Sequence, residues 1–190
     1  MGLGATAKQV STELIVGGET VWDDLRFPVS NIRIPGTNPA SWETLNGFQV
    51  LGFDAQAVND EQVFFLAQMP HGYKHGTDLH FHVHWTPETD DVAVVRWGLE
   101  YVWANINGSF SGDTTTVYGE QSINTNAGKH ILTELTTISG TDKTFSSMLM
   151  CRLFRNSSHE NDTFDDFAYL LEADFHYEID QIGTRQEYVK

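Results

Sequence analysis

The sequence predicts an all-β protein, an antiparallel β-sandwich of jelly-roll type with about eight strands. Three observations predict this class. Apolar and polar residues alternate with a period of two along several segments, which is the spacing of a strand with one buried face. Runs with helical periodicity are missing, while Thr, Val, Phe, Tyr and Trp recur. Asn-Gly and Ser-Gly pairs punctuate the chain at turn-like intervals.

The N-terminal part of the chain carries the weakest strand pattern. Residues 1–20 are small and polar, and we expect a flexible N-terminal arm there. Prolines at 28, 35 and 39 favour an extended, looping lead-in from Val21 to about Trp42. One helical turn is expected at 40–48. We expect residues 21–190 to form a single β-sandwich domain.

The strand pattern strengthens from residue 48 onward. The expected strands are 48–53, 63–69, 78–85, 92–103, 114–123, 131–138, 145–154 and 168–180. The last is the clearest, because apolar residues from Tyr169 to Ile179 alternate with acidic residues and His176. Strands that follow one another without helices between them predict antiparallel sheets.

Composition excludes several classes of partner. The chain has 26 acidic and 11 basic residues, a net charge of −15, and its Lys and Arg residues are scattered, so nucleic-acid binding is not expected. The single cysteine, Cys151, excludes an intrachain disulfide. Residues 1–11 lack the features of a signal peptide, and no apolar run reaches the ~18 residues that span a membrane. We therefore expect folding in a cytoplasm and no membrane partner.

A row of histidines is the strongest candidate for chemistry. His80, His82 and His84 share one face of an expected strand, with neighbours about 6.7 Å apart. Imidazole is the commonest protein ligand of metals, so the row predicts a divalent metal site at these residues. Because the outer pair is too far apart to share one ion, a third ligand must come from elsewhere, and the candidates are Glu172, Asp174 and His176 of an adjacent strand, or the same histidines of a second subunit. The alternative interpretation is a polar or interfacial strand face without a metal.

Other active-site patterns are incomplete or missing. Gly76, His82, His84 and Glu88 match the first half of the cupin motif, but Val95 stands in place of its closing glycine and no second motif follows. No nucleophile elbow, Walker loop or dinucleotide fingerprint occurs. We therefore expect no catalytic residues and no cofactor other than the metal.

Short segments spread over most of the chain carry a resemblance. They are Val21–Arg26, Pro70–Lys74, His82–Trp85, Trp97–Tyr101, Ser146–Leu149, Cys151–Arg155, Asp174–Asp180 and Arg185–Lys190. In these segments the chain resembles a family of tailed-bacteriophage virion structural proteins. The resemblance implies a virion component and transfers no catalytic residues.

The leading hypothesis is a non-enzymatic virion subunit, a capsid decoration protein that forms a homotrimer and contacts other virion proteins such as the major capsid protein. Its expected location is the virion, after folding in the host bacterial cytoplasm. Two alternatives belong to other classes. One is a cupin-like metal-binding enzyme that uses His82, His84 and Glu88. The other is a carbohydrate-binding module of a tail fibre or spike.

Overall fold

The computed structural model describes residues 20–187, and within them ten strands form two antiparallel sheets. The strands are β1 Val21–Pro28, β2 Ser41–Leu45, β3 Phe48–Phe53, β4 Gln62–Gln68, β5 Leu79–Pro87, β6 Val92–Ala104, β7 Thr115–Asn124, β8 Ile131–Glu134, β9 Met148–Arg155 and β10 Ala168–Ile179. A single 3-10 turn, Val29–Asn31, is the only helical element of this part of the chain. The predicted all-β antiparallel sandwich is confirmed.

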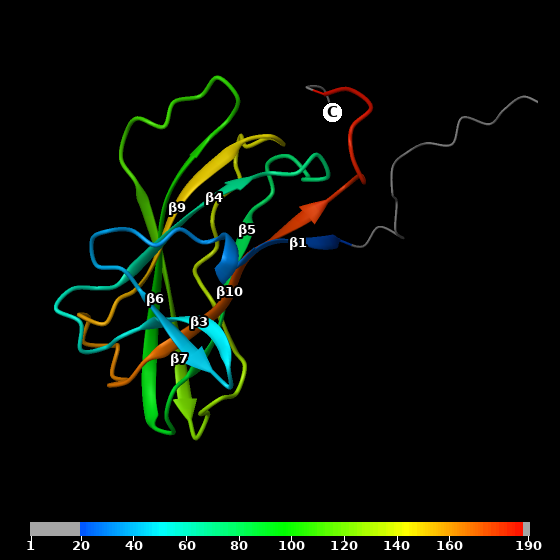
Figure 1. The fold of residues 1–190 in the computed structure, drawn as a ribbon. Helices are drawn as coiled ribbons and strands as arrows, with labels where there is room; N and C mark the ends of the chain where they lie inside the picture. The colour runs from blue at the N-terminus through cyan, green and yellow to red at the C-terminus, as the bar shows by residue number, and fades with distance from the viewer. Residues whose placement is uncertain (1–19, 188–190) are drawn as a thin grey trace, which may run out of the picture.

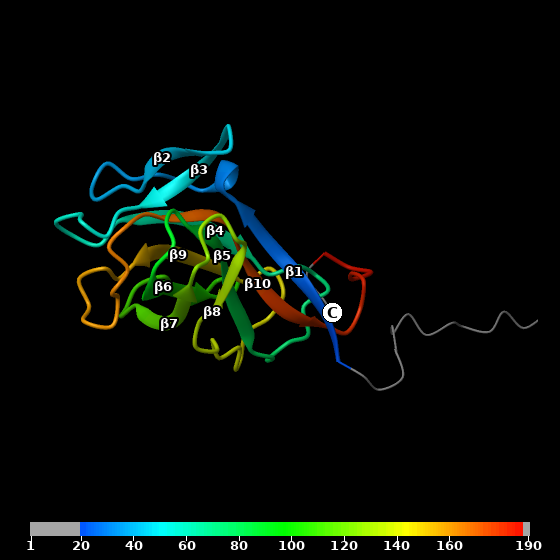
Figure 2. The same cartoon turned by 90° about the horizontal axis from the view of Figure 1, so that it is seen from below.

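The two sheets have different strand orders (Figures 1 and 2). One sheet has the order β2-β3-β10-β5-β8, with β1 also paired to β10, and the other has the order β4-β9-β6-β7. Strand β10 is central to the larger sheet because it pairs with three other strands. Its residues 172–179 pair with β1, its residues 168–170 pair with β3, and its other edge pairs with β5.

The inner faces of both sheets form one hydrophobic core. Trp85 of β5 and Trp97 of β6 are fully buried, with their ring centroids 6.0 Å apart, so the two sheets meet at this pair. The indole N–H of Trp85 donates to the hydroxyl of Thr133 at 2.8 Å. The ring of Phe53 in β3 packs edge-on against Trp97. These contacts follow from the predicted alternation, because every second residue of each strand points inward.

The structure corrects the expected path between residues 21 and 48. All eight expected strands are present, and β1 and β2 are additional. Residues 21–28 form an edge strand rather than a looping lead-in, because Pro28 stands at the strand end, where no ladder hydrogen bond is lost. The helical turn expected at 40–48 is wrong: β2 and β3 form a hairpin whose turn residues, Asn46 and Gly47, both have positive φ.

Residues 1–19 of the expected N-terminal arm lie outside the described residues. Among the residues that the structure describes, no helix is long and apolar enough to cross a membrane.

Candidate functional site

The three histidines predicted from the sequence project from the outer face of β5. Their side chains are partly or largely buried by neighbours on that face. The residues that alternate with them are fully buried on the core side, namely Leu79, Phe81, Val83 and Trp85. The strand pattern therefore places His80, His82 and His84 on the surface of the six-stranded sheet, away from the core.

Neighbouring strands add carboxylates and a fourth imidazole to this face. The register places Asp174 of β10 opposite His82 on one side, and Glu134 of β8 opposite His82 on the other. It also places His176 of β10 opposite His80. Because cross-strand partners point to the same face of a sheet, these side chains form a compact cluster.

Three members of the cluster converge on one point. His82, Asp174 and His176 each offer a ligand atom within 4.8 Å of those of the other two. Nδ1 of His82 lies 3.5 Å from Oδ1 of Asp174, and Nε2 of His176 lies 3.7 Å from Oδ2 of Asp174. The side chains of His82 and Asp174 are only 8% and 5% exposed. Nδ1 of His82 and Oδ1 of Asp174 are buried without a hydrogen-bond partner.

The other histidines of the face have different partners. Nε2 of His84 lies 3.3 Å from Oδ2 of Asp174, while its Nδ1 lies 2.8 Å from Nε2 of His130. Nδ1 of His80 lies 2.8 Å from Oε1 of Glu134. These two histidines therefore flank the point of convergence rather than belong to it.

Electrostatics within the cluster favour ionised carboxylates. Burial alone would raise the pKa of Asp174, but the favourable contacts with His82 and His84 outweigh it and hold the pKa well below its usual range. The hydrogen bond from His80 lowers the pKa of Glu134. Contact with Asp174 raises the pKa of His84. The cluster thus combines imidazoles with a buried, charged carboxylate.

The structure brings some of the predicted metal ligands together and separates others. His82 meets Asp174 and His176, two of the third ligands that the sequence suggested, whereas Glu172 pairs with Arg26 at 2.6 Å. Glu88, the carboxylate of the half cupin motif, lies beyond the end of β5 and outside the converging group. Metal binding itself stays a prediction.

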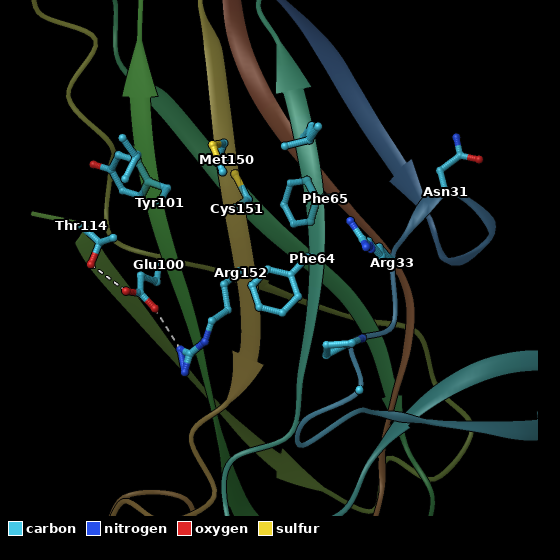
Figure 3. Close-up of a pocket in the computed structure, with 14 residues that line it drawn as sticks. Asn31, Arg33, Phe64, Phe65, Glu100, Tyr101, Thr114, Met150, Cys151 and Arg152 are labelled. Carbon is cyan, nitrogen blue, oxygen red and sulfur yellow. Dashed lines mark hydrogen bonds and ion pairs between the residues drawn. The ribbon is translucent and has the colours of Figure 1, made fainter. Parts of the chain in front are cut away.

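A second candidate surface, a groove of about 910 Å³, lies on the outer face of the four-stranded sheet (Figure 3). Its floor is apolar and includes Phe64 and Leu66 of β4, Met150 of β9 and Val102 of β6. Leu66 and Met150 are 60% and 50% exposed, which is unusual for the solvent side of an antiparallel sheet. The segment that contains Asn31 and Arg33 forms one wall.

A row of polar side chains crosses the groove beside Phe64 (Figure 3). Nε of Arg152 donates to Oε1 of Gln62 at 2.7 Å, and its Nη1 donates to Oε2 of Glu100 at 3.1 Å. The hydroxyl of Thr114 donates to the other oxygen of Glu100 at 2.6 Å. Because each side chain fixes the next, the row presents polar groups in set positions above the apolar floor.

The predictions from the sequence do not include this groove. The signal was the run Val63-Phe64-Phe65-Leu66-Ala67, which is apolar at every position. Val63, Phe65 and Ala67 are buried in the core, so the two residues between them must face outward. An unbroken apolar run in an antiparallel strand therefore indicates a second apolar surface.

Comparison with known proteins gives no sequence family. No family model matches the chain, and no curated protein matches it. Solved carbohydrate-binding modules are similar to it. The xylan-binding domain CBM22-2 of Paenibacillus barcinonensis Xyn10C has a TM-score of 0.49 at 13% identity, covering 80% of this chain and 98% of that chain. The CBM36-1 domain of a multidomain xylanase from the hindgut metagenome of Trinervitermes trinervoides has a TM-score of 0.44 at 14% identity, covering 80% and 96%. The module TmCBM27, described for specific mannan recognition, has a TM-score of 0.42 at 13% identity, covering 84% and 98%.

These findings correct the resemblance to tailed-bacteriophage virion proteins, which is wrong, because the similar solved structures are carbohydrate-binding modules. The capsid decoration role, the virion location and the homotrimer with a major capsid protein as partner are wrong on the same ground. The physical reason lies in the segments that carried the resemblance. Several of them, such as Asp174–Asp180, lie largely on strands, where any antiparallel sandwich requires the same alternation.

Proposed function

We propose that this protein is a non-catalytic binding domain that holds a neutral oligosaccharide in the groove over β4, β9 and β6. One observation carries the proposal: the groove has an apolar floor beside a fixed polar row. A pyranose ring has the matching construction, with C–H groups on its face and hydroxyls at its rim. Phe64 offers an aromatic surface to the face, and the remaining N–H groups of Arg152 can donate to hydroxyl oxygens.

The charge of the protein favours a neutral ligand. The net charge is −15, so the field around the molecule repels polyanions such as uronic-acid polymers and nucleic acids. Within the groove, the guanidinium of Arg152 is already paired with Glu100. A ligand that offers hydroxyls extends this network without displacing the ion pair.

The same groove supports binding without hydrolysis. Glycoside hydrolysis uses two carboxyl groups, which lie roughly 5–9.5 Å apart on either side of the scissile bond. Glu100 is the only carboxylate among the residues that line the groove, and both of its oxygens accept hydrogen bonds. A ligand bound here therefore meets one engaged carboxylate and no second one.

Affinity electrophoresis in gels that contain xylan, mannan, β-glucan or galactan tests the proposal. We expect retardation in at least one gel, and its loss in the variant Phe64→Ala, which removes the ring from the groove floor. Trp42→Ala is the matched control, because Trp42 is an exposed aromatic residue that does not line the groove. This control variant should migrate like the wild type, and no reducing ends should appear on incubation with the bound polysaccharide.

Three results would overturn the proposal. They are the absence of retardation in all four gels, equal retardation of Phe64→Ala and wild type, or loss of retardation in Trp42→Ala. Thermal unfolding of each variant shows whether a loss reflects the groove or the fold. If Phe64→Ala unfolds early, Leu66→Gln replaces it, because Leu66 is exposed and its side chain contributes little to the core.

A further inference from the structure

We infer that His82, Asp174 and His176 form a binding site for a divalent transition-metal ion on the outer face of the six-stranded sheet. The site lies at the junction of β5 and β10 and is independent of the groove. Its ligand set, two imidazoles and one carboxylate, suits Zn²⁺ and similar ions that accept nitrogen and oxygen ligands. The row His80, His82 and His84 supplies only one of these ligands.

The spacing of the ligand atoms fits an ion better than it fits hydrogen bonds. Two ligand atoms on one tetrahedral zinc ion lie about 3.3 Å apart when each bond is about 2.0 Å. Nδ1 of His82 lies 3.5 Å from Oδ1 of Asp174, and Nε2 of His176 lies 3.7 Å from Oδ2, so the two oxygens of the carboxylate would share the ion between the two histidines. Both distances exceed the usual length of a charge-assisted hydrogen bond, about 2.7–2.9 Å.

Two buried atoms lack the partners that a purely structural role requires. Nδ1 of His82 and Oδ1 of Asp174 face each other, yet neither makes a hydrogen bond. A buried polar atom left unpaired costs free energy, so native structures rarely retain one without a reason. A cation bound between His82 and Asp174 would satisfy both atoms at once.

Further carboxylates lie on both sides of the proposed ion. Oε2 of Glu134 lies 3.9 Å from Nε2 of His82, the ring nitrogen opposite to the ion. This distance is too long for the hydrogen bond by which outer-shell carboxylates orient ligating imidazoles, so Glu134 contributes a nearby negative charge. On the solvent side, Nε2 of His176 lies 3.0 Å from Oδ1 of Asp24, and both side chains are partly exposed. The exposed side gives an ion access to the site, and the 3.0 Å contact brings Asp24 within reach as a further ligand.

Titration calorimetry of chelator-treated protein with Zn²⁺ tests the inference. We expect one ion per chain, a rise in thermal unfolding temperature with Zn²⁺, and a visible absorption spectrum when Co²⁺ replaces it. His176→Gln should weaken binding by roughly 100-fold or more, which is the upper range for losing even an outer-shell partner. His80→Gln is the matched control on the same face and should bind Zn²⁺ as the wild type does.

The outcomes separate the alternatives. If the wild type binds no Zn²⁺, or if His176→Gln binds it like the wild type, the inference is wrong. If His80→Gln loses as much affinity as His176→Gln, the ligands are the row of β5 and not the cross-strand group. Asp174→Asn provides a second test, because it keeps the size of the side chain and removes its charge.

Discussion

Arg155 and Asp162 form an ion pair inside the sandwich, with side chains 0% and 1% exposed. Nη2 of Arg155 lies 2.7 Å from Oδ1 of Asp162, and Nε lies 3.0 Å from Oδ2. The same guanidinium donates to the backbone oxygens of Phe53 and Asp166. Since Arg155 belongs to the four-stranded sheet and Phe53 to the six-stranded sheet, one side chain connects both sheets and the loop that precedes β10.

Removing this guanidinium should be strongly destabilising. Arg155→Met leaves the carboxylate of Asp162 buried without its partner, and we expect a loss of about 3–5 kcal/mol in the free energy of unfolding. Urea denaturation measures it. Lys74→Met is the control, because Lys74 pairs with Glu178 at an exposed position, where loss of the pair costs less than about 1 kcal/mol. Equal effects of the two substitutions would contradict the role assigned to Arg155.

The pattern of the chain predicted the sandwich because burial on one face imposes alternation. It did not predict β1, since Val21–Pro28 is an edge strand with few inward residues, and prolines follow it closely. It also did not predict Arg155 in the interior. A charged residue at the end of an apolar strand is normally predicted to be exposed to solvent. Only the path of the loop that covers it shows that it is buried.

The sequence also predicts only part of each candidate site. Alternation placed His82 on one face of its strand and Asp174 and His176 on one face of another. Only the register, which pairs Asp174 with His82, shows which of them converge. The register depends on turn geometry and on contacts between distant segments, which a single sequence does not display. The groove was missed because its floor residues sit within an apolar run that also supplies the core.

Gly140 should not tolerate a side chain. A Cβ at this buried position would meet the backbone oxygen of Thr77 and the hydroxyl of Tyr73, and backbone atoms cannot move aside easily. We expect Gly140→Ala to lower the free energy of unfolding by about 1–3 kcal/mol, measured by urea denaturation. Gly183→Ala, with open space around its Cβ, should change it by less than about 0.5 kcal/mol. A stable Gly140→Ala variant would show that the 139–142 turn shifts readily.

Cys151 should be inert in the folded protein. Its side chain is buried on the core face of β9, and burial raises the pKa of its thiol far above the usual range, so almost no thiolate forms. Ellman's reagent should therefore react with it only after unfolding. Met150→Cys provides the matched control, because residue 150 is the adjacent position, on the exposed face of the same strand. This added thiol should react in the folded state; rapid reaction of the wild type would mean that β9 opens.

Alkaline pH should destabilise the protein partly through Tyr73. Burial raises the pKa of Tyr73 to about 12, from an unfolded value near 10. The folded state therefore favours the protonated phenol, and its contribution to stability is complete below about pH 10 and is lost as the pH rises toward about 12. Urea denaturation at about pH 8 and about pH 11 should show a smaller difference for Tyr73→Phe than for the wild type.

Some alkaline sensitivity should remain in Tyr73→Phe, because burial also raises the pKa of Tyr101, Tyr169 and Tyr177. An unchanged difference between the two pH values in Tyr73→Phe would show that Tyr73 does not contribute.

The two proposed sites should act independently. The groove lies on the outer face of the four-stranded sheet and the His82–Asp174–His176 cluster on the outer face of the other, with the tightly packed core between them. No ligand atom of the cluster reaches the groove, so we expect Zn²⁺ to change the affinity for a bound polysaccharide by less than about fivefold, the lower end of typical allosteric coupling.

His176→Gln should bind polysaccharide like the wild type, and Phe64→Ala should bind Zn²⁺ like the wild type. Coupling is reciprocal, so bound polysaccharide should likewise change the affinity for Zn²⁺ by less than about fivefold. Loss of polysaccharide binding on adding a chelator would show that binding in the groove depends on a metal ion and would refute the independence of the two sites.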